Sequence, residues 1–377
     1  MLDSCARLHL DRRGRLGSYL GCGLVGVVLG AAVVVALGVA RALPAGLVAV
    51  AVAAPLVSFA LAVKLGRILV GYERIVLYEC LAAMLGGSAL ALWLAGQPVV
   101  QGLDLVMVGV ATALVAGRIG CLRVGCCHGR PCRWGIAYPP GHGRAGFPVH
   151  YVRVRLFPIP LVESAVAAGL AVLGAATLVA PHVPGEVLAT TAALYGLARF
   201  LLELARGDED RPSWLGLSEA QWIAVISAWL VVLAARAWSL DRGPLYLGIA
   251  AALVAAAVAV ALARRIPALA LREPRRVREL HDALVALGSG RAASSSPVPT
   301  VAETPYGLRL SRSEPADQRG DRVVHLALSL ASEPLGARAA RCVAGQVGCL
   351  LHLGAAPELS RGLAPGVFHL RWTTSPD

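Results

Sequence analysis

The feature that most constrains this chain is a run of about 20 apolar residues that recurs along it, the length a helix needs to cross a bilayer. The runs fall at 17–40, 44–63, 75–95, 103–120, 159–181, 187–205, 219–238 and 244–263. Hydrophobic residues make up 57% of the chain and charged residues 15%, whereas soluble proteins carry about 25% charged residues. This composition excludes a soluble single-domain enzyme and predicts an all-α polytopic membrane protein with seven to eight transmembrane helices.

The first apolar run follows Arg12, Arg13 and Arg15, an arrangement that secretory signal peptides share. The run is longer than the apolar part of a signal peptide, and seven more runs follow it. We therefore expect a retained transmembrane helix.

Three segments are expected along the chain. Residues 1–263 form a transmembrane domain, 264–304 a basic helix and linker, and 305–377 a small soluble α/β module. Alternating apolar residues at 323–328 and a helical-looking run from 337 to 353 predict the strands and the helix of that module.

The net charge is +12, and Lys64 is the only lysine among 35 basic residues. In a membrane protein such an excess points to anionic lipid head groups before nucleic acid, so membrane lipids are the expected partners and nucleic acid is not. Most arginines fall on one side of an eight-helix count, at 7–15, 67–74, 118–155 and 264–278. The positive-inside rule then places both termini in the cytoplasm.

The most informative stretch ends the fourth apolar run and contains Arg118. An arginine at that depth is unfavourable unless it is paired or binds an anion, although it can also extend to the head groups. Together with Arg123 and Arg130 it predicts a cradle for a lipid phosphate. Four glycines would let the backbone turn and approach the ligand: Gly117, Gly120, Gly125 and Gly129.

A second stretch carries Tyr195, Arg199 and Glu203, which are spaced four apart and so share one helix face. Polar groups inside the membrane need partners. Arg199 and Glu203 could simply neutralise each other, or the face could bind a ligand. Glu163, near the start of the fifth run, is open to the same two interpretations.

Five of the nine cysteines are scattered, and the other four lie between positions 121 and 132. Cys121, Cys126, Cys127 and Cys132 lie close to His128, but no CxxC pair is present. A metal site, a disulfide and ordinary small packing residues all remain open here. The spacing fits no standard zinc pattern, so no metal ligand is predicted, and no cofactor is expected.

Motifs from several segments belong together in order and spacing: Gly66-Arg67, Gly117-Arg118-Ile119-Gly120, Gly125, Gly129-Arg130-Pro131, Trp134-Gly135-Ile136-Ala137-Tyr138-Pro139, Tyr195-Gly196, Arg199-Phe200, Glu203, Gly216-Leu217-Ser218 and Gln221. Over roughly residues 15–240 they resemble the prolipoprotein diacylglyceryl transferase family. The resemblance implies transfer of a diacylglyceryl group from phosphatidylglycerol to the lipobox cysteine of a prolipoprotein. It implies a multi-pass protein of the bacterial plasma membrane that takes part in lipoprotein biosynthesis.

The resemblance also implies roles for individual residues. Arg118 and Arg199 would hold the phosphate and stabilise it as it leaves, Tyr195 would orient the head group or an arginine, and Glu203 would fix Arg199. Further substrate-binding residues are expected in the same motifs: Arg67, Gly117, Gly120, Arg123, Gly129, Arg130 and Glu163. The family also places its Gly-Arg motif toward the outer face, opposite to the orientation that the charge count predicts.

The sequence departs from the family pattern at several polar positions. The family has Asn where this chain has Cys121 and Val124, and Glu where it has Cys126. Its His-Gly-Gly appears as 85–87, Leu-Gly-Gly, and its His-Pro-Ser-Gln-Leu-Tyr-Glu stretch is reduced to 157–163. These losses leave a second hypothesis, a non-catalytic lipid-binding or thiol-linked membrane protein on the same scaffold.

A thiol acceptor must lose its proton before it reacts, and the family histidine is missing here. His128 is the candidate base, and His142 and His150 are alternatives. An arginine-rich mouth that favours the thiolate would make a dedicated base unnecessary.

Overall fold

The computed structural model describes residues 13–70, 76–143, 147–208, 213–264, 273–289, 301–313, 322–331, 334–351, 353 and 357–374. The chain divides into two compact units. The helical unit comprises Met1–His128 and Pro158–Ala261, and the mixed unit comprises Gly129–Phe157 and Leu262–Asp377.

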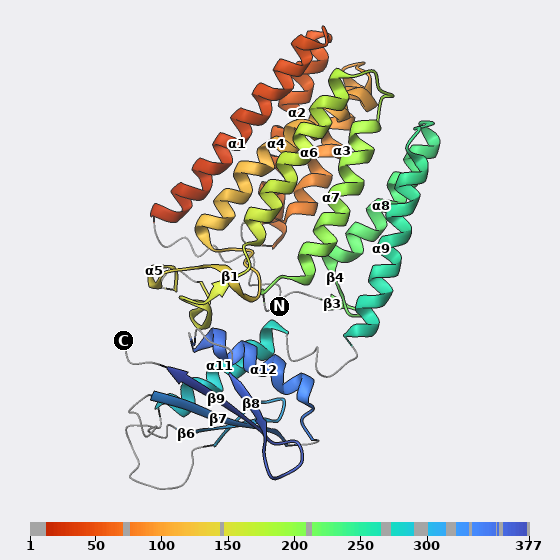
Figure 1. Cartoon of the computed structure of the whole chain (residues 1–377). Coiled ribbons are helices and arrows are strands. Elements are labelled where there is room, and N and C mark those ends of the chain that lie inside the picture. Colours follow the sequence, from red (N-terminus) through yellow and green to blue (C-terminus); the bar gives the residue numbers. More distant parts are fainter. Residues whose placement is uncertain are drawn as a thin grey trace. The chain divides into compact units, whose positions relative to one another are not determined.

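The helical unit is built from long helices that run alongside one another (Figure 1). They are α1 (Arg13–Ala40), α2 (Ala45–Val70), α3 (Leu77–Leu94), α4 (Val99–Val124), α6 (Ile159–Val179), α7 (Glu186–Leu204), α8 (Glu219–Ala237) and α9 (Gly243–Ala263). Within the described residues, eight helices are long and apolar enough to cross a membrane. The predicted polytopic all-α architecture is confirmed, and each helix overlaps one of the apolar runs.

Helix α4 is the centre of this unit, because it contacts α1, α2, α3, α6 and α7. Glycines let α1 approach it closely. A Cβ on Gly26 would lie 2.5 Å from the carbonyl oxygen of Ala113, and one on Gly30 would lie 2.6 Å from that of Gly109. Small residues at such crossings are the usual means of close helix packing in lipid.

A buried carboxylate joins α4 to the start of α7. Asp104 is fully buried, and its Oδ2 and Oδ1 accept hydrogen bonds from the backbone N–H groups of Gly185 (2.6 Å) and Leu188 (2.8 Å). The first N–H groups of a helix lack partners within the helix and carry partial positive charge, so a carboxylate there is stabilised. These two hydrogen bonds explain why a carboxylate is buried here: Asp104 holds the start of α7 against α4.

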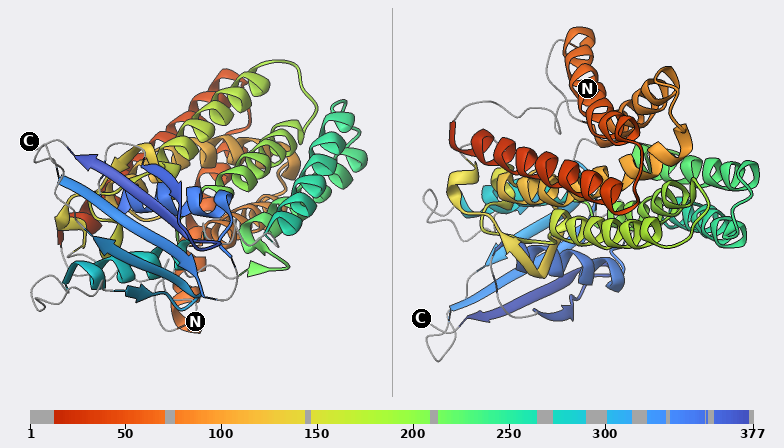
Figure 2. Two further views of the ribbon diagram at one scale, coloured as in Figure 1. Left: turned by 60° about the horizontal axis from the view of Figure 1, so that its bottom comes forward. Right: turned by 90° about the horizontal axis from the view of Figure 1, so that it is seen from above.

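The mixed unit contains an antiparallel five-stranded sheet with the order β5-β6-β7-β9-β8. Two helices pack on one face of this sheet (Figure 2). The elements are α11 (Pro274–Ser289), β5 (Val301–Glu303), β6 (Leu308–Ser313), β7 (Arg322–Leu330), α12 (Ala337–Leu350), β8 (Glu358–Arg361) and β9 (Phe368–Thr374). The predicted small α/β module is confirmed.

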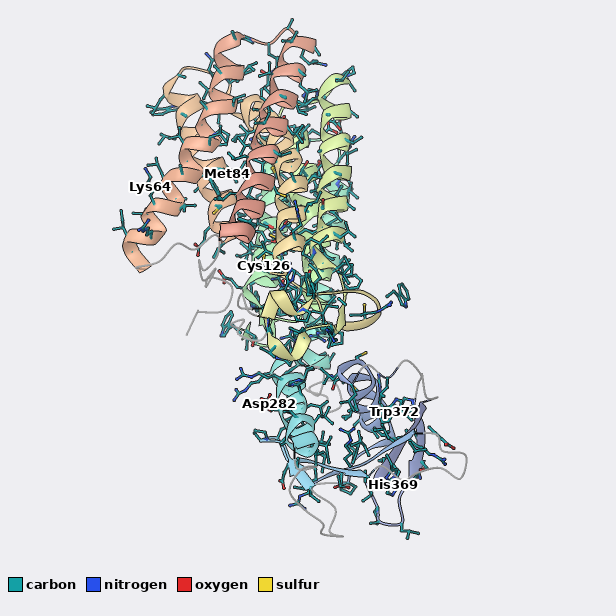
Figure 3. All side chains as sticks on the ribbon, turned by 90° about the vertical axis from the view of Figure 1, so that its left-hand side faces the viewer. Lys64, Met84, Cys126, Asp282, His369 and Trp372 are labelled. Carbon is teal, nitrogen blue, oxygen red and sulfur yellow. The ribbon has the colours of Figure 1, made fainter. Side chains whose placement is uncertain are left out.

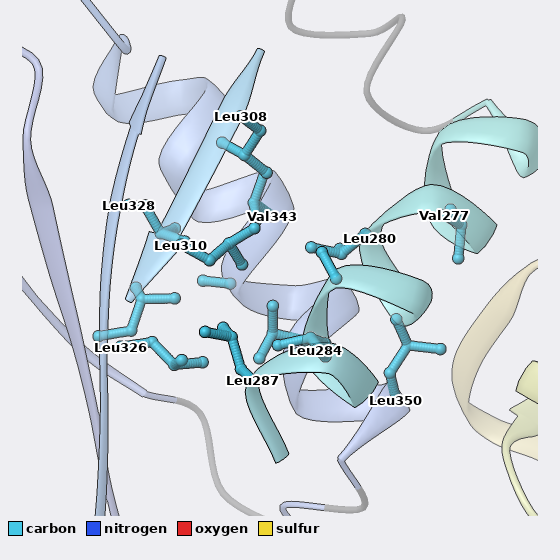
Figure 4. Close-up of a cluster of buried hydrophobic side chains, with 14 of the residues drawn as sticks. Val277, Leu280, Leu284, Leu287, Leu308, Leu310, Leu326, Leu328, Val343 and Leu350 are labelled. Atoms are coloured by element: carbon cyan, nitrogen blue, oxygen red, sulfur yellow. The ribbon is translucent and has the colours of Figure 1, made fainter. Parts of the chain in front are cut away.

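Alternation along the strands places one set of side chains in the core of this unit. Leu308, Leu310, Leu326 and Leu328 are fully buried and face Leu280 from α11 and other helix residues (Figure 4). The core thus explains both the alternating pattern of β7 and the apolar stripe of α11.

The compact units divide the chain differently from the predicted segments. Helix α11, which was expected to be part of a separate basic segment, contributes Val277, Leu280, Leu284 and Leu287 to the core of the mixed unit. Residues 129–157, expected within the transmembrane domain, pack with the mixed unit through Tyr138, Phe147 and Tyr151. They form β1 (Pro131–Ala137), α5 (Pro140–Gly143), a 3₁₀ turn (Val149–Tyr151) and β2 (Arg155–Leu156). Residues 290–300 of the predicted linker lie outside the described residues.

Candidate functional site

A cluster of buried charged and polar side chains lies where α4, α6 and α7 pack together. We call it the charge cluster, and its members are Arg118 from α4, Glu163 from α6, and Tyr195, Arg199 and Glu203 from α7. None of the five is more than 7% exposed. The Ser164 hydroxyl donates to the carbonyl of Val115 at 2.9 Å and ties α6 to α4 beside the cluster.

Glu163 is the centre of the charge cluster. Its Oε1 lies 2.9 Å from Nη2 of Arg118, accepts a hydrogen bond of 2.5 Å from the Tyr195 hydroxyl, and lies 3.9 Å from Nε of Arg199. A single carboxylate oxygen therefore brings together two arginines that are 81 positions apart in sequence.

The i,i+4 pair predicted on α7 is present. Nη1 of Arg199 lies 3.0 Å from Oε2 of Glu203, so this arginine contacts two carboxylates. The simple alternative, an arginine neutralised only within its own helix, is therefore incomplete. Two arginines and two glutamates leave the cluster formally neutral, which is what burial of charges in a membrane requires.

Several polar atoms in this cluster are not satisfied. Among the described residues, Nε of Arg118, Oε2 of Glu163 and the hydroxyl of Tyr78 from α3 are buried without a hydrogen-bond partner. Tyr78 interacts electrostatically with both arginines and both glutamates of the cluster. Buried polar groups are rarely left unpaired, so these atoms retain hydrogen-bonding capacity that the described residues do not use.

The backbone turn predicted at Gly117 and Gly120 is wrong, whereas a role of these glycines in substrate binding stays a prediction. Gly117 and Gly120 lie inside α4, which continues to Val124, and the chain turns only at Gly125, which has a left-handed φ of 83°. A Cβ on Gly120 would lie 3.1 Å from Cβ of Cys22 and 3.3 Å from the ring of Tyr19. Gly120 thus serves the packing of α1 on α4. The helix continues past both glycines because a backbone in an apolar segment satisfies its hydrogen bonds by remaining helical.

The other predicted site residues lie in several places. Arg67 and Arg123 are exposed in the last turns of α2 and α4, and His128 is buried just beyond α4. Gly129 and Arg130 belong to the mixed unit, where the Gly129 N–H donates to the carbonyl of Phe157 and the Phe157 N–H to that of Arg130.

Sequence reasoning missed two polar residues in the helical unit. Tyr78 opens α3, and only its polar hydroxyl in an apolar run marks it. Arg206 is 4% exposed and forms an ion pair with Asp208 just after α7. The N–H of the intervening Gly207 donates to the carbonyl of His128 at 3.1 Å, which joins the ends of the two motif segments.

Three cysteine sulfurs meet at the end of α4, close to the position labelled Cys126 in Figure 3. The thiol groups of Cys121, Cys126 and Cys127, which we call the thiol triad, all lie within 4.8 Å of one another. Hydrogen bonds to Cys121 and Cys127, together with burial, raise the pKa of Cys126 well above its ordinary value. Cys126 is therefore a protonated thiol at neutral pH in this arrangement.

The fold and the charge cluster define the class: a polytopic α-helical membrane protein whose helices bury a paired arginine–glutamate site. A family model for prolipoprotein diacylglyceryl transferase matches residues 80–237, a range that contains all five residues of the cluster. The family resemblance seen in the sequence is thereby confirmed.

One curated relative is the phosphatidylglycerol–prolipoprotein diacylglyceryl transferase of Clostridium tetani, which is 29% identical over 144 residues. The match covers 38% of this chain and 55% of the relative, so this chain spans about half the length of that protein. No solved structure matches the chain.

Proposed function

We propose that the helical unit transfers a diacylglyceryl group from phosphatidylglycerol to the cysteine thiol of a prolipoprotein. The observation that carries the proposal is the convergence of Arg118 and Arg199, from separate helices, on one buried carboxylate. The family match and the name of the Clostridium tetani relative support the same reaction.

The arginines suit a phosphodiester substrate. A guanidinium offers donors in a planar fork that matches two phosphate oxygens. Nε of Arg118 has no hydrogen-bond partner among the described residues, so one donor is available without breaking the ion pair to Glu163. Surroundings that exclude water strengthen this attraction.

The reaction breaks one bond and forms one. The acceptor sulfur, as thiolate, attacks the diacylglycerol carbon that bears the phosphate, a carbon–sulfur bond forms, and the carbon–oxygen bond to the phosphate breaks. Glycerol phosphate leaves with the electron pair and one more negative charge than the diester had. Arg118 and Arg199 would stabilise that charge as it develops, which is the role of donors fixed in advance of the reaction.

The remaining members of the charge cluster would act as positioning residues. Glu163 holds Arg118 at 2.9 Å, and the Tyr195 hydroxyl fixes the same carboxylate at 2.5 Å. Glu203 holds Arg199 from one turn further along α7. These contacts would keep both guanidinium groups in place before the lipid arrives.

The acceptor thiol must lose a proton, and the described part of the helical unit offers few groups to take it. Leu85 of α3, which stands where the family resemblance leads us to expect a histidine, cannot accept a proton. The proton would pass to His128 or directly to solvent where nearby arginines favour the thiolate. The second candidate function, lipid binding without transfer, follows from the same substitution.

The substrates imply where the protein works. Phosphatidylglycerol and a prolipoprotein with its lipobox cysteine meet at the bacterial plasma membrane, so we assign the protein to that membrane. The eight apolar helices make it a multi-pass protein there.

The test uses the purified full chain in phosphatidylglycerol vesicles with a lipobox peptide. We expect glycerol phosphate release and thioether formation, both lowered by roughly 10²–10³-fold in Arg118→Ala and Arg199→Ala. Lysine at either position should not restore activity, because it lacks the planar fork. Arg236→Ala, an exposed arginine on α8, is the matched control.

Two results would contradict the proposal. Wild-type turnover in Arg118→Ala would show that this arginine does not hold the phosphate. Saturable phosphatidylglycerol binding without release of glycerol phosphate would favour the non-catalytic alternative.

A further inference from the structure

The thiol triad is a feature that diacylglyceryl transfer does not use. Cys121 lies in the last turn of α4, and the Gly125 N–H closes that turn on its carbonyl at 3.0 Å. Gly125 and then Cys127 adopt left-handed backbone conformations, with φ of 83° and 61°. The turn at Gly125 directs the chain back so that the Cys126 thiol donates to the Cys121 carbonyl at 3.7 Å.

The conformation of Cys127 is unfavourable for a residue with a side chain. A left-handed φ brings the Cβ of a non-glycine residue too close to its own backbone and is therefore unfavourable. Such conformations persist where the surroundings hold them, and they concentrate at functional sites. Here the left-handed conformation accompanies the approach of the Cys127 sulfur to the sulfurs of Cys121 and Cys126.

The spacing of the sulfurs fits one ion between them. With metal–sulfur bonds of about 2.3 Å, three thiolates arranged in a plane around an ion stand about 4 Å apart. The sulfurs of the triad lie within 4.8 Å of one another before any ion is bound. Each therefore needs to move by less than about 1 Å. A disulfide would need a contact of about 2 Å and would leave the third thiol unused.

We propose that Cys121, Cys126 and Cys127 bind a single soft metal ion in three-coordinate geometry, with Cu(I) as the best match. Thiolates select soft ions such as Cu(I) over hard ones. Zn²⁺ also binds thiolates but is almost always four-coordinate in structural sites. Among the described residues, three histidine, cysteine or carboxylate donor atoms converge here, and all three are sulfurs.

The charge around the triad also suits such a complex. Binding one Cu(I) to three thiols releases three protons and leaves a complex of charge −2, with no electron transferred. The guanidinium of Arg118 interacts electrostatically with Cys121 and Cys127 and would offset part of that negative charge. Tyr19 of α1 interacts electrostatically with all three thiols. Neighbours of this kind orient metal ligands and strengthen the site.

The test is an anaerobic titration of the purified full chain with Cu(I) against a chromophoric Cu(I) chelator. We expect one Cu(I) per chain, with three sulfur neighbours in X-ray absorption spectra. Cys127→Ser should weaken Cu(I) binding by more than about 100-fold, since loss of a ligand exceeds the loss of an outer partner. Cys126→Ser should weaken Cu(I) binding to the same extent. The conclusion then does not depend on the folding of one variant alone.

Matched controls change cysteines outside the triad. Cys132→Ser and Cys342→Ser should bind Cu(I) as the wild type does. The proposal fails if Cys132→Ser loses as much affinity as Cys127→Ser, or if Cu(I) has two sulfur neighbours. It also fails if Zn²⁺ displaces Cu(I) from the wild-type protein. None of these measurements depends on lipid transfer, so they stand apart from the proposed function.

Discussion

Replacing Glu163 by glutamine tests the organisation of the charge cluster most directly. The substitution keeps the shape of the side chain and removes its charge. Glu163 is fully buried and contacts Arg118 at 2.9 Å, the Tyr195 hydroxyl at 2.5 Å and Arg199 at 3.9 Å. The variant would bury two guanidinium groups against Glu203 alone and leave one positive charge uncompensated.

Breaking a buried ion pair by removing one partner costs about 3–5 kcal/mol. At roughly 2–4 °C of melting temperature per kcal/mol for a domain of this size, Glu163→Gln should melt about 10 °C below the wild type. An anionic lipid would supply the missing charge. Phosphatidylglycerol vesicles should therefore restore more of the melting temperature in the variant than phosphatidylcholine vesicles do.

The assay is thermal unfolding of the full chain in vesicles of each lipid, followed by circular dichroism. Glu186→Gln is the matched control, because Glu186 pairs with Arg242 at 3.0 Å in a partly exposed position. An exposed pair contributes about 0–1 kcal/mol, so this variant should change little. Equal melting temperatures for the two variants, or no preference for phosphatidylglycerol, would refute the reasoning.

Three further predictions concern the proton, the topology and the mixed unit. If the arginine field favours the thiolate, His128→Gln should leave the rate–pH profile unchanged and Arg123→Gln should shift it to higher pH; a loss of roughly 10²-fold in His128→Gln would make that histidine the base. A labelling cysteine at Ser360, exposed on β8, should react from outside intact cells if the family orientation holds, and only after lysis if the charge rule holds. Burial and the charges of His369 and Arg371 lower the pKa of His325. As the pH falls below about 6.5, His325 is protonated in the unfolded chain before it is protonated in the folded one. The free energy of unfolding of the mixed unit should therefore decrease as the pH is lowered. Urea unfolding at pH 7 and pH 5 should show a smaller decrease in His325→Gln than in the wild type.

Much of the helical architecture was predictable because bilayer crossing depends on local composition. The run predicted at 159–181 corresponds to α6, Ile159–Val179, and that at 219–238 to α8, Glu219–Ala237. The end of α4 was placed too early because the prediction took glycines as the start of a turn. In an apolar segment the backbone satisfies its hydrogen bonds by continuing the helix, and α4 extends to Val124.

The mixed unit shows where the sequence was less informative. Strand β7 was visible in its alternating residues, and α12 in its helical pattern. That residues 129–157 and α11 pack with this sheet could not be predicted. Their buried members, such as Tyr151 and Leu280, are ordinary apolar residues that any neighbouring core could have accepted.

The sequence by itself determined the membrane class, the apolar helices and the arginine motifs, because hydropathy and charge are properties of each segment alone. Only the tertiary structure decided that Glu163 joins Arg118 to Arg199 and that three cysteine sulfurs converge at the end of α4. Those contacts depend on how each helix is rotated and how closely it approaches its neighbours. Rotation and approach are set by side chains on several helices at once, such as the glycines between α1 and α4.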